Sequence, residues 1–365
     1  MPSLKRIVIQ DFRNIRLQEI AFSPNVNCIS GGNGEGKTNL MDAIWYLSMA
    51  KSAFAAGDRF NFRHGTDAFS LAGVYAMPSG PDARFSISVD AAGEKKIRRD
   101  DKPYPKVSAH IGELPVVMVS PSDISLVSES GEGRRRFANA VLSQLDREYL
   151  AAVQQYNRLL AQRNRLLKED GADLSLLDVF DLRMEACADV IHAARKRFTE
   201  QLQPLVAQSY DALSGGGEQV SVEYRSDGEK GPLSAVLAAC RDRDRALRHT
   251  TAGVHRDDFL FRMDGYPIRH CGSQGQQKSF LVALKFAQYE IMKKEYGYPP
   301  MLLLDDVFDK LDMDRISNLL GLVAGSDYGQ IFITDSNKVR MAGIVDRITP
   351  ERAYFVASGG EFKQL

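Results

Sequence analysis

The chain has 365 residues, of which 44% are hydrophobic, and its 47 basic residues balance 47 acidic ones. This composition is typical of a folded protein of about two domains and excludes wholesale disorder. Because the charges cancel, any nucleic-acid surface is expected only as a local basic patch. No apolar run approaches the roughly 20 residues that cross a bilayer, and the first residues lack a signal-peptide core. The four cysteines lack CxxC spacing, so a reduced, cytoplasmic protein is expected. Because no apolar run is long enough to cross a bilayer, no membrane partner is expected.

The first 120 residues predict short strands separated by turns. The alternating apolar runs that support these strands lie at residues 5–10, 26–30, 69–75, 85–89 and 116–119. The segment after Val89 reads AAGEKKIRRDDKP, and its charge and turn residues predict a polar loop.

The middle of the chain predicts long helices. Residues 146–170 contain neither proline nor glycine, and the next run carries apolar residues three or four positions apart. These residues are Leu177, Phe180, Met184, Cys187, Ile191, Ala194, Phe198, Leu202 and Leu205. The turn EDGADLS between the two runs predicts an antiparallel helical hairpin. Strands and helices then alternate again, at residues 259–263, 277–296, 301–304 and 330–334.

A glycine-rich motif near the start predicts a phosphate site. The segment GGNGEGKT fits GxxxxGK[ST] at every position, follows the apolar run VNCIS and precedes a helical pattern. Lys37 is expected to reach the β and γ phosphates of ATP, and Thr38 to ligate Mg²⁺. The residues expected to direct backbone amides at phosphate oxygens are Gly31, Gly32, Asn33, Gly34, Glu35 and Gly36.

A pair of carboxylates predicts the hydrolytic centre. Four apolar residues, 301–304, precede Asp305 and Asp306. A buried strand would place both acids at the carboxyl edge of a sheet, where α/β folds bind ligands. Asp305 is expected to hold Mg²⁺ through water, and Asp306 to orient the attacking water. We therefore predict an ATPase with ATP and Mg²⁺ as cofactors, with Lys37, Asp305 and Asp306 as catalytic residues and Thr38 and Asp305 as metal ligands.

A third motif, SQGQQK, begins at Ser273, which is 32 residues before Asp305 (305 − 273). It stands immediately before a strong helical pattern, so its hydroxyl and free amides predict a second anion site. The alternative is a helix cap without a ligand. Its place between the helical block and the carboxylate strand favours the anion site, with Ser273, Gly275 and Gln276 as contacts.

The spacing of these motifs predicts one ATPase head with an insertion. Lys37 and Asp305 are 268 residues apart (305 − 37), too far for a compact mononucleotide fold. We expect an α/β head in two lobes, residues 1–122 and 249–365, and an inserted mainly α-helical domain at residues 123–248. A GTPase is excluded because Arg340, after Asn337-Lys338, stands where a guanine-selecting Asp belongs.

Together these motifs resemble the RecF family of bacterial recombination mediators, in the ABC/SMC-type group of P-loop ATPases. The resemblance runs along nearly the whole chain and is closest at residues 253–288, from GVHRDDF through GSQGQQKSFLVALKFAQ. Residues 131–146, GEGRRRFANAVLSQLD, and residues 156–168, YNRLLAQRNRLLK, resemble further family segments.

Several residue roles are implied by this resemblance alone. The segment FRN resembles the family's own, which implies that Arg13 and Asn14 lie near the nucleotide. The segment from His255 to Asp258 is expected near the nucleotide or a dimer face. In ABC ATPases the signature motif closes over the ATP of a second head, so one P-loop and one signature per chain imply a homodimer that forms on ATP binding.

The resemblance also implies partners: double-stranded and gapped DNA, RecR together with RecO, and a recombinase that is loaded on single-stranded gaps. Slow, DNA-stimulated ATP hydrolysis is implied as well. Three basic clusters are candidates for contacts with DNA phosphates. They are Lys95-Lys96 with Arg98-Arg99, Arg134-Arg135-Arg136, and Arg195-Lys196-Arg197.

Some positions depart from the wider ABC pattern. Asp306 stands where transporters usually have Glu, and Thr334 and Asp335 stand where they have a switch histidine. No clear Q-loop glutamine follows Val119. Two other functions stay open. The ATP-binding subunit of a transporter would carry an adenine-stacking aromatic residue and the switch histidine, and neither is found. A nucleotide-gated structural protein with negligible hydrolysis remains compatible with the short side chain of Asp306.

Overall fold

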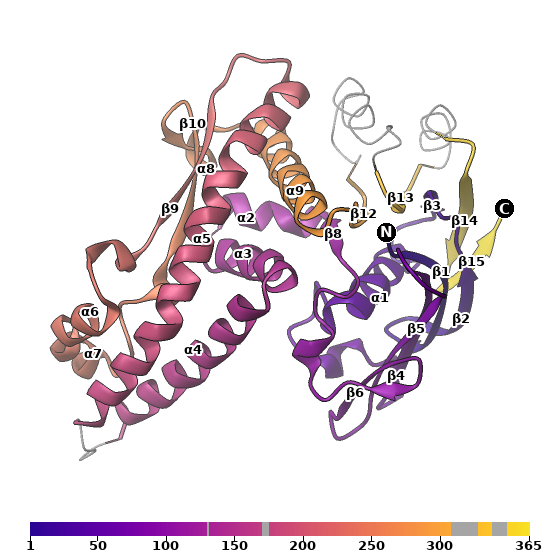
Figure 1. The fold of residues 1–365 in the computed structure, drawn as a ribbon. Helices are drawn as coiled ribbons and strands as arrows, with labels where there is room; N and C mark the ends of the chain where they lie inside the picture. The colour runs from indigo at the N-terminus through magenta and orange to yellow at the C-terminus, as the bar shows by residue number, and fades with distance from the viewer. Residues whose placement is uncertain (130, 170–174, 308–327, 338–348) are drawn as a thin grey trace. The chain divides into compact units, whose positions relative to one another are not determined.

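The structure is a computed structural model, and it describes residues 1–129, 131–169, 175–307, 328–337 and 349–365 (Figure 1). The chain divides into two compact units by its internal contacts. We call residues Met1–Asp123 with Gln288–Leu365 the head unit, and Ile124–Ala287 the helical unit. The head unit combines helices with β-sheets, and the helical unit is mainly α-helical, as the sequence predicts.

A mostly parallel sheet forms the core of the head unit. Its strand order is β15-β14-β3-β13-β12-β8, and only β15 runs antiparallel to its neighbour. Every residue of β3, β8, β12 and β13 is buried, which explains the apolar runs of β8 and β12 and the mainly apolar sequences of β3 and β13. The strands are β3 (Val26–Ser30), β8 (Val116–Val119), β12 (Met301–Leu304), β13 (Ile331–Asp335), β14 (Arg352–Ser358) and β15 (Glu361–Gln364).

An antiparallel sheet completes the head unit, in the order β2-β1-β4-β5-β6-β7. Burial alternates along β4 and β5, so one face of these strands belongs to the core. Helix α1 (Lys37–Met49) contacts β1, β4 and β5. The strands are β1 (Ser3–Phe12), β2 (Ile15–Ala21), β4 (Phe69–Ala76), β5 (Ala83–Val89), β6 (Lys95–Arg99) and β7 (Lys102–Pro103).

The prediction of a polar loop after Val89 is wrong. Residues Lys95–Arg99 form strand β6, which pairs with β5 from Val89↔Lys95 to Phe85↔Arg99. Ile97 is 4% exposed and faces the core, while Lys96 and Arg98 are exposed. A single inward residue between two charged ones gives too weak an alternation to be recognised from the sequence.

Gln330 joins the two sheets of the head unit. Its buried side chain accepts from the amide of Leu4 at 2.6 Å and donates to the carbonyl oxygens of Leu4 and Ser23, each at 2.8 Å. The amide therefore satisfies backbone groups of β1 and of the loop before β3 at once. Short 3₁₀ helices occur in this unit at Asp58–Asn61 and Val107–Ala109.

The helical unit is built on the predicted hairpin. Helix α4 (Arg147–Leu166) packs along α5 (Leu176–Ser214), as Figure 1 shows. Residues 170–174 of the expected turn lie outside the described residues. The Asp146 side chain accepts from the amides of Glu148 and Tyr149 and so begins α4. Gly215, with φ of 78°, ends α5.

Further strands and helices accompany this hairpin. Strand β10 pairs antiparallel with both β9 and β11. These strands are β9 (Val220–Arg225), β10 (Asp258–Met263) and β11 (Tyr266–Pro267). The remaining helices are α2 (Ser125–Ser128), α3 (Gly131–Leu145), α6 (Leu233–Ala239), α7 (Arg241–Leu247), α8 (Ile268–Cys271) and α9 (Gln274–Tyr296). No helix in the described part of the chain has the length and apolarity needed to span a membrane.

The second domain boundary differs from the expected one at residue 248, because the helical unit extends to Ala287. Strand β10 pairs with β9, and the Arg134 guanidinium binds the Asp258 carboxylate through two hydrogen bonds of 2.8 and 3.0 Å. Residues after 248 therefore complete the fold of this unit. The segment around Ser273 belongs to it as well.

Two arginines expected to be available for DNA are instead internal. Arg134 is 7% exposed and pairs with Asp258, and Arg195 is 3% exposed and lies 2.7 Å from the Asp257 carboxylate. Arg195 also donates to the Tyr149 hydroxyl at 3.2 Å. Burial of such charges is tolerated only when they are paired. A role for Arg134 or Arg195 in binding phosphates is therefore wrong.

Candidate nucleotide site

The phosphate loop lies between β3 and α1, as its motif requires. Gly34 and Gly36 have φ values of 84° and 103°, a conformation that side-chain-bearing residues rarely adopt. A Cβ on Gly36 would also lie 2.9 Å from the Asn14 side-chain oxygen. Two independent constraints thus demand glycine at position 36, and the helix begins at the next residue.

Lys37 lies along this loop. Its ammonium donates to the carbonyl oxygens of Gly31 at 2.8 Å and Gly32 at 3.0 Å. The residue as a whole is 3% exposed, so the charge is held close to the loop backbone. An ammonium there, beside the amides at a helix N-terminus, forms a site complementary to an anion.

Thr38 and Asp305 meet at the edge of the parallel sheet. The Thr38 hydroxyl donates to the Asp305 carboxylate at 2.9 Å, and the Thr334 hydroxyl donates to its other oxygen at 2.8 Å. Burial raises the pKa of Asp305 above its ordinary value, and the two hydroxyl groups partly oppose that shift. The carboxylate is thus oriented by the ends of β12 and β13 and by the start of α1.

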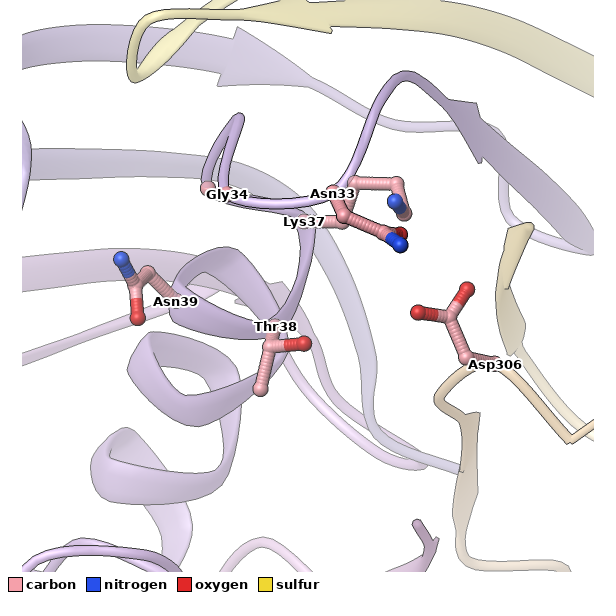
Figure 2. A pocket seen from close by; sticks show the side chains of 7 residues that line it. Asn33, Gly34, Lys37, Thr38, Asn39 and Asp306 are labelled. Atoms are coloured by element: carbon pink, nitrogen blue, oxygen red, sulfur yellow. The ribbon is translucent and has the colours of Figure 1, made fainter. Parts of the chain in front are cut away.

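Asp306 lines the neighbouring cavity, which has a volume of about 300 Å³. Figure 2 shows the Thr38 hydroxyl and the Asp306 carboxylate turned toward the same space. The backbone of Asp306 has φ of 46°, and its amide donates to the Thr334 hydroxyl at 2.9 Å. Such a conformation costs a non-glycine residue roughly 1–2 kcal/mol. The cavity is lined by Asn33, Gly34, Gly36, Lys37, Thr38, Asn39 and Asp306.

These donors fit a magnesium-bound nucleotide. Mg²⁺ prefers hard oxygen ligands, and it commonly takes one or two carboxylates together with phosphates and water. Thr38 and Asp305 supply a hydroxyl and a carboxylate in direct contact. The described residues hold no cluster of three or more His, Cys, Asp or Glu side chains suited to a metal. Phosphate oxygens and water would complete the coordination of a bound Mg²⁺.

Arg13 and Asn14 lie beside the loop, outside the set of residues that line the cavity. The Arg13 guanidinium pairs with the buried Asp42 carboxylate at 2.7 Å. The Asn14 side chain accepts from Asn39, which does line the cavity, at 2.7 Å. Both residues brace the start of α1, and direct contact with a nucleotide stays a prediction for them.

The segment SQGQQK, residues 273–278, which we call the signature segment, forms a capped helix start in the helical unit. The Ser273 amide donates to the Gln276 side chain at 2.7 Å, and the Gln276 amide donates to the Ser273 hydroxyl at 3.3 Å. This reciprocal pair is a capping box. Gly275 follows the first residue of α9, and the Gln276 side chain also donates to Glu218 at 2.7 Å. Anion binding by Ser273, Gly275 and Gln276 stays a prediction.

Sequence reasoning gave no role to Thr334 or to Asn39. Thr334 was identified only as the replacement of a histidine, yet its hydroxyl bonds to both acidic residues of the site. The signal in the sequence is a small polar residue near the end of β13, the strand that pairs with the carboxylate strand β12. Asn39 belongs to the first turn of α1, where side chains next to a phosphate loop can reach the cavity.

The chain resembles known proteins over its whole length. Residues 3–76 match the family model described as RecF/RecN/SMC N terminal domain. The DNA replication and repair protein RecF of Phocaeicola vulgatus is 41% identical over 360 residues, which are 98% of this chain and 97% of that protein. The protein of the same name from Cytophaga hutchinsonii is 37% identical over 366 residues, 99% of this chain and 96% of that one.

Similar solved structures indicate the same family as these relatives. A structure titled as the recombination mediator protein RecF-ATP in the RecFOR pathway is 28% identical, with a TM-score of 0.90, over 100% of this chain and 98% of that one. An Smc head domain from Pyrococcus furiosus, 16% identical with a TM-score of 0.59, shares the fold. The resemblance drawn from the motifs is confirmed: the chain belongs to the RecF family of DNA replication and repair proteins, and its fold is that of an ABC/SMC-type ATPase head.

Proposed function

We propose that this chain is an ATP-dependent DNA-binding protein of recombinational repair. It binds ATP and Mg²⁺ at the phosphate loop, closes as a homodimer on double-stranded or gapped DNA, and hydrolyses ATP slowly. The contact between Thr38 and Asp305, beside a cavity that Lys37 and Asp306 line, carries this proposal. The structure of a RecF with ATP, 28% identical to this chain, supports ATP as the nucleotide.

The residues of the site divide the work of binding and hydrolysis. The Lys37 ammonium, which bonds to two loop carbonyl oxygens, is positioned to exchange them for phosphate oxygens. Thr38 and Asp305 would hold Mg²⁺, which would supply charge neutralisation at the phosphates. Asp306 accepts a hydrogen bond from the attacking water and orients it. Its side chain is one methylene shorter than Glu, which is consistent with slow hydrolysis.

Homodimerisation rests on the family relationship and on the motif count. One phosphate loop and one signature segment occur per chain. Closure of two chains would bring the Ser273 helix start of one to the nucleotide of the other. RecR together with RecO, which help load the recombinase on single-stranded gaps, are the protein partners that the family relationship supports. The repair proteins among the relatives favour this function over a transporter subunit.

One of the three basic clusters offers the better surface for DNA. With Arg134 and Arg195 engaged in internal ion pairs, exposed neighbouring cations remain as Lys96 and Arg98 on β6 and as Lys196 and Arg197 on α5. The β6 pair lies opposite Ser88 and Ser86 of β5, so small side chains flank these two cations on the same face. We propose that this face contacts DNA phosphates, which requires charge and access rather than base recognition.

ATP turnover and sedimentation test the proposed activity. Wild-type protein is expected to shift to a dimer with ATP and to hydrolyse it faster when duplex or gapped DNA is added. Lys37→Ala is expected to lose ATP binding while its circular dichroism stays that of the wild type. Undiminished ATP affinity in Lys37→Ala would reject the phosphate-loop assignment. Negligible turnover with and without DNA would instead support a nucleotide-gated structural protein, and turnover that DNA leaves unchanged would reject DNA stimulation.

A matched pair of double variants tests the DNA surface. Lys96→Gln with Arg98→Gln should weaken DNA binding and lower the slope of log affinity against log salt by about 0.9 per lost contact. Lys196→Gln with Arg197→Gln removes two exposed charges from α5 and is the control. If only the α5 variant weakens binding, the DNA surface lies on the helical unit.

A further inference from the structure

The carboxyl-terminal strand β14 lies directly against the first glycine of the phosphate loop. It runs parallel to β3, and the Ser30 hydroxyl donates to the Phe355 carbonyl oxygen at 3.1 Å. A Cβ on Gly31 would lie 2.6 Å from the carbonyl oxygen of Ala357. The backbone of β14 therefore leaves no space for a side chain at this position of the loop.

The turn after β14 bonds to the middle of the same loop. Gly359 and Gly360 have φ values of 58° and 87°, as a tight two-residue hairpin turn requires. The Gly359 amide donates to the Glu35 carboxylate, and the Gly360 amide donates to the Glu35 carbonyl oxygen at 3.0 Å. Both amides of the turn thus donate hydrogen bonds to the same loop residue, Glu35. That residue stands between the two left-handed glycines, 34 and 36.

Asn14 lies next to both the hairpin turn and the phosphate loop. A Cβ on Gly360 would lie 2.5 Å from the Asn14 carbonyl oxygen, and one on Gly36 would lie 2.9 Å from its side-chain oxygen. The turn, Asn14 and the loop are therefore in mutual contact. A residue that is held by both its side-chain carboxylate and its backbone carbonyl group has little freedom, and the loop backbone on either side of it is restrained as well.

We infer that Glu35 is a positioning residue for nucleotide binding, clamped by the carboxyl-terminal hairpin turn at Gly359 and Gly360. The inference rests on the proposed nucleotide function. The clamp holds the amides of residues 34–36 in the conformation that receives phosphate, so the ligand does not have to order them. A preorganised site of this kind binds more tightly without any additional contact. Residues at the far end of the sequence thereby become part of the phosphate site.

Two substitutions at Glu35 separate the clamp from its charge. Glu35→Ala removes the acceptor for the Gly359 amide and should raise the Kd for a fluorescent ATP analogue about tenfold. Glu35→Gln keeps an acceptor oxygen and should restore the affinity. Glu361→Ala, which removes an exposed carboxylate of the same hairpin, is the charge-matched control.

Hydrogen exchange gives a readout independent of activity. In nucleotide-free protein, the peptide that contains residues 31–37 should exchange faster in Glu35→Ala than in Glu35→Gln or the wild type. Wild-type affinity and exchange in Glu35→Ala would overturn the inference, and so would equal weakening by both Glu35 variants. Normal ATP binding by Lys37→Ala would reject the proposed function itself, whatever the Glu35 variants do.

Discussion

At Thr334, one hydroxyl group serves both acidic residues of the site. It donates to the Asp305 carboxylate at 2.8 Å and accepts from the Asp306 amide at 2.9 Å. The distance between the two acids along the chain is fixed, but their relative orientation depends on this bridge from the adjacent strand. Thr334 therefore does more than fill the place of a histidine.

Because Asp305 is proposed to hold Mg²⁺ and Asp306 faces the cavity, binding and hydrolysis should separate in Asp306→Asn. This variant is expected to bind ATP and Mg²⁺ with wild-type affinity and to hydrolyse ATP more slowly, by a factor on the order of 10². Asp305→Asn, the matched control, should instead weaken the Mg²⁺ dependence of binding. Single-turnover hydrolysis measures the first effect and nucleotide titration the second. A wild-type rate in Asp306→Asn would place the water-positioning group elsewhere.

The local residues of the site could be predicted from the sequence, whereas its supporting contacts could not. Lys37, Thr38 and Asp305 belong to motifs whose spacing is fixed by one loop and one strand. Arg195 looked like an exposed cation because its partner Asp257 lies 62 residues further along the chain. A run of three basic residues gives no sign of which one turns inward.

Arg195 and Arg197 provide a direct test of that difference. Arg195→Gln leaves the buried Asp257 carboxylate without its guanidinium, and should lower the free energy of unfolding of the helical unit by about 3–5 kcal/mol. Arg197→Gln removes an exposed charge and should change it by less than about 0.5 kcal/mol. Urea unfolding followed by helical circular dichroism compares them. Equal midpoints for the two variants would contradict the buried ion pair.

Among the elements, those with strong patterns were predicted and those with weak patterns were missed. The buried strands β8 and β12 are continuous apolar runs, β3 is mainly apolar, and the α4–α5 hairpin has a clear helical period. Strand β6 has one buried residue flanked by charges. The carboxyl-terminal strands β14 and β15 were also missed, although β14 alternates, because their short hairpin is recognisable only beside β3.

Helix α9 shows why a motif can support two interpretations. The capping box between Ser273 and Gln276 satisfies amides at the helix start without any ligand. The same serine and free amides are what a signature segment needs for a phosphate. Sequence pattern and local geometry are therefore identical for a plain cap and for a cap that also binds a partner's nucleotide.

At the scale of the whole molecule, the cap and the dimer contact can be separated by substitution. Ser273→Arg adds a bulky cation at the helix start, whereas Ser273→Ala only removes the cap, at a cost of about 1 kcal/mol. Both variants should bind ATP as monomers. Ser273→Arg should lose ATP-driven dimerisation and DNA-stimulated turnover, whereas Ser273→Ala, which lacks the hydroxyl but keeps the space for a phosphate, should only weaken them, as sedimentation and phosphate release measure.

Mixing two inactive proteins extends this test. In a dimer of Ser273→Arg with Lys37→Ala, one composite site carries both lesions and the other carries neither. Partial ATPase activity should therefore return, provided that one intact site closes the dimer. If Ser273→Arg still dimerises with ATP, or cannot bind ATP as a monomer, the segment is only a helix cap or acts within its own chain.

The position of β3 in its sheet has a consequence for synthesis on the ribosome. Its partners in the sheet are β13 and β14. The ribosome must therefore add 301 residues after Ser30 before it reaches Ile331, the first residue of β13 (331 − 30). At about 5–20 residues per second, this interval is on the order of 15–60 s. The helical unit is continuous in sequence and can fold meanwhile. Nascent chains stalled before residue 331 should therefore bind chaperones at their buried-strand segments and fail to retain nucleotide until the last hairpin emerges.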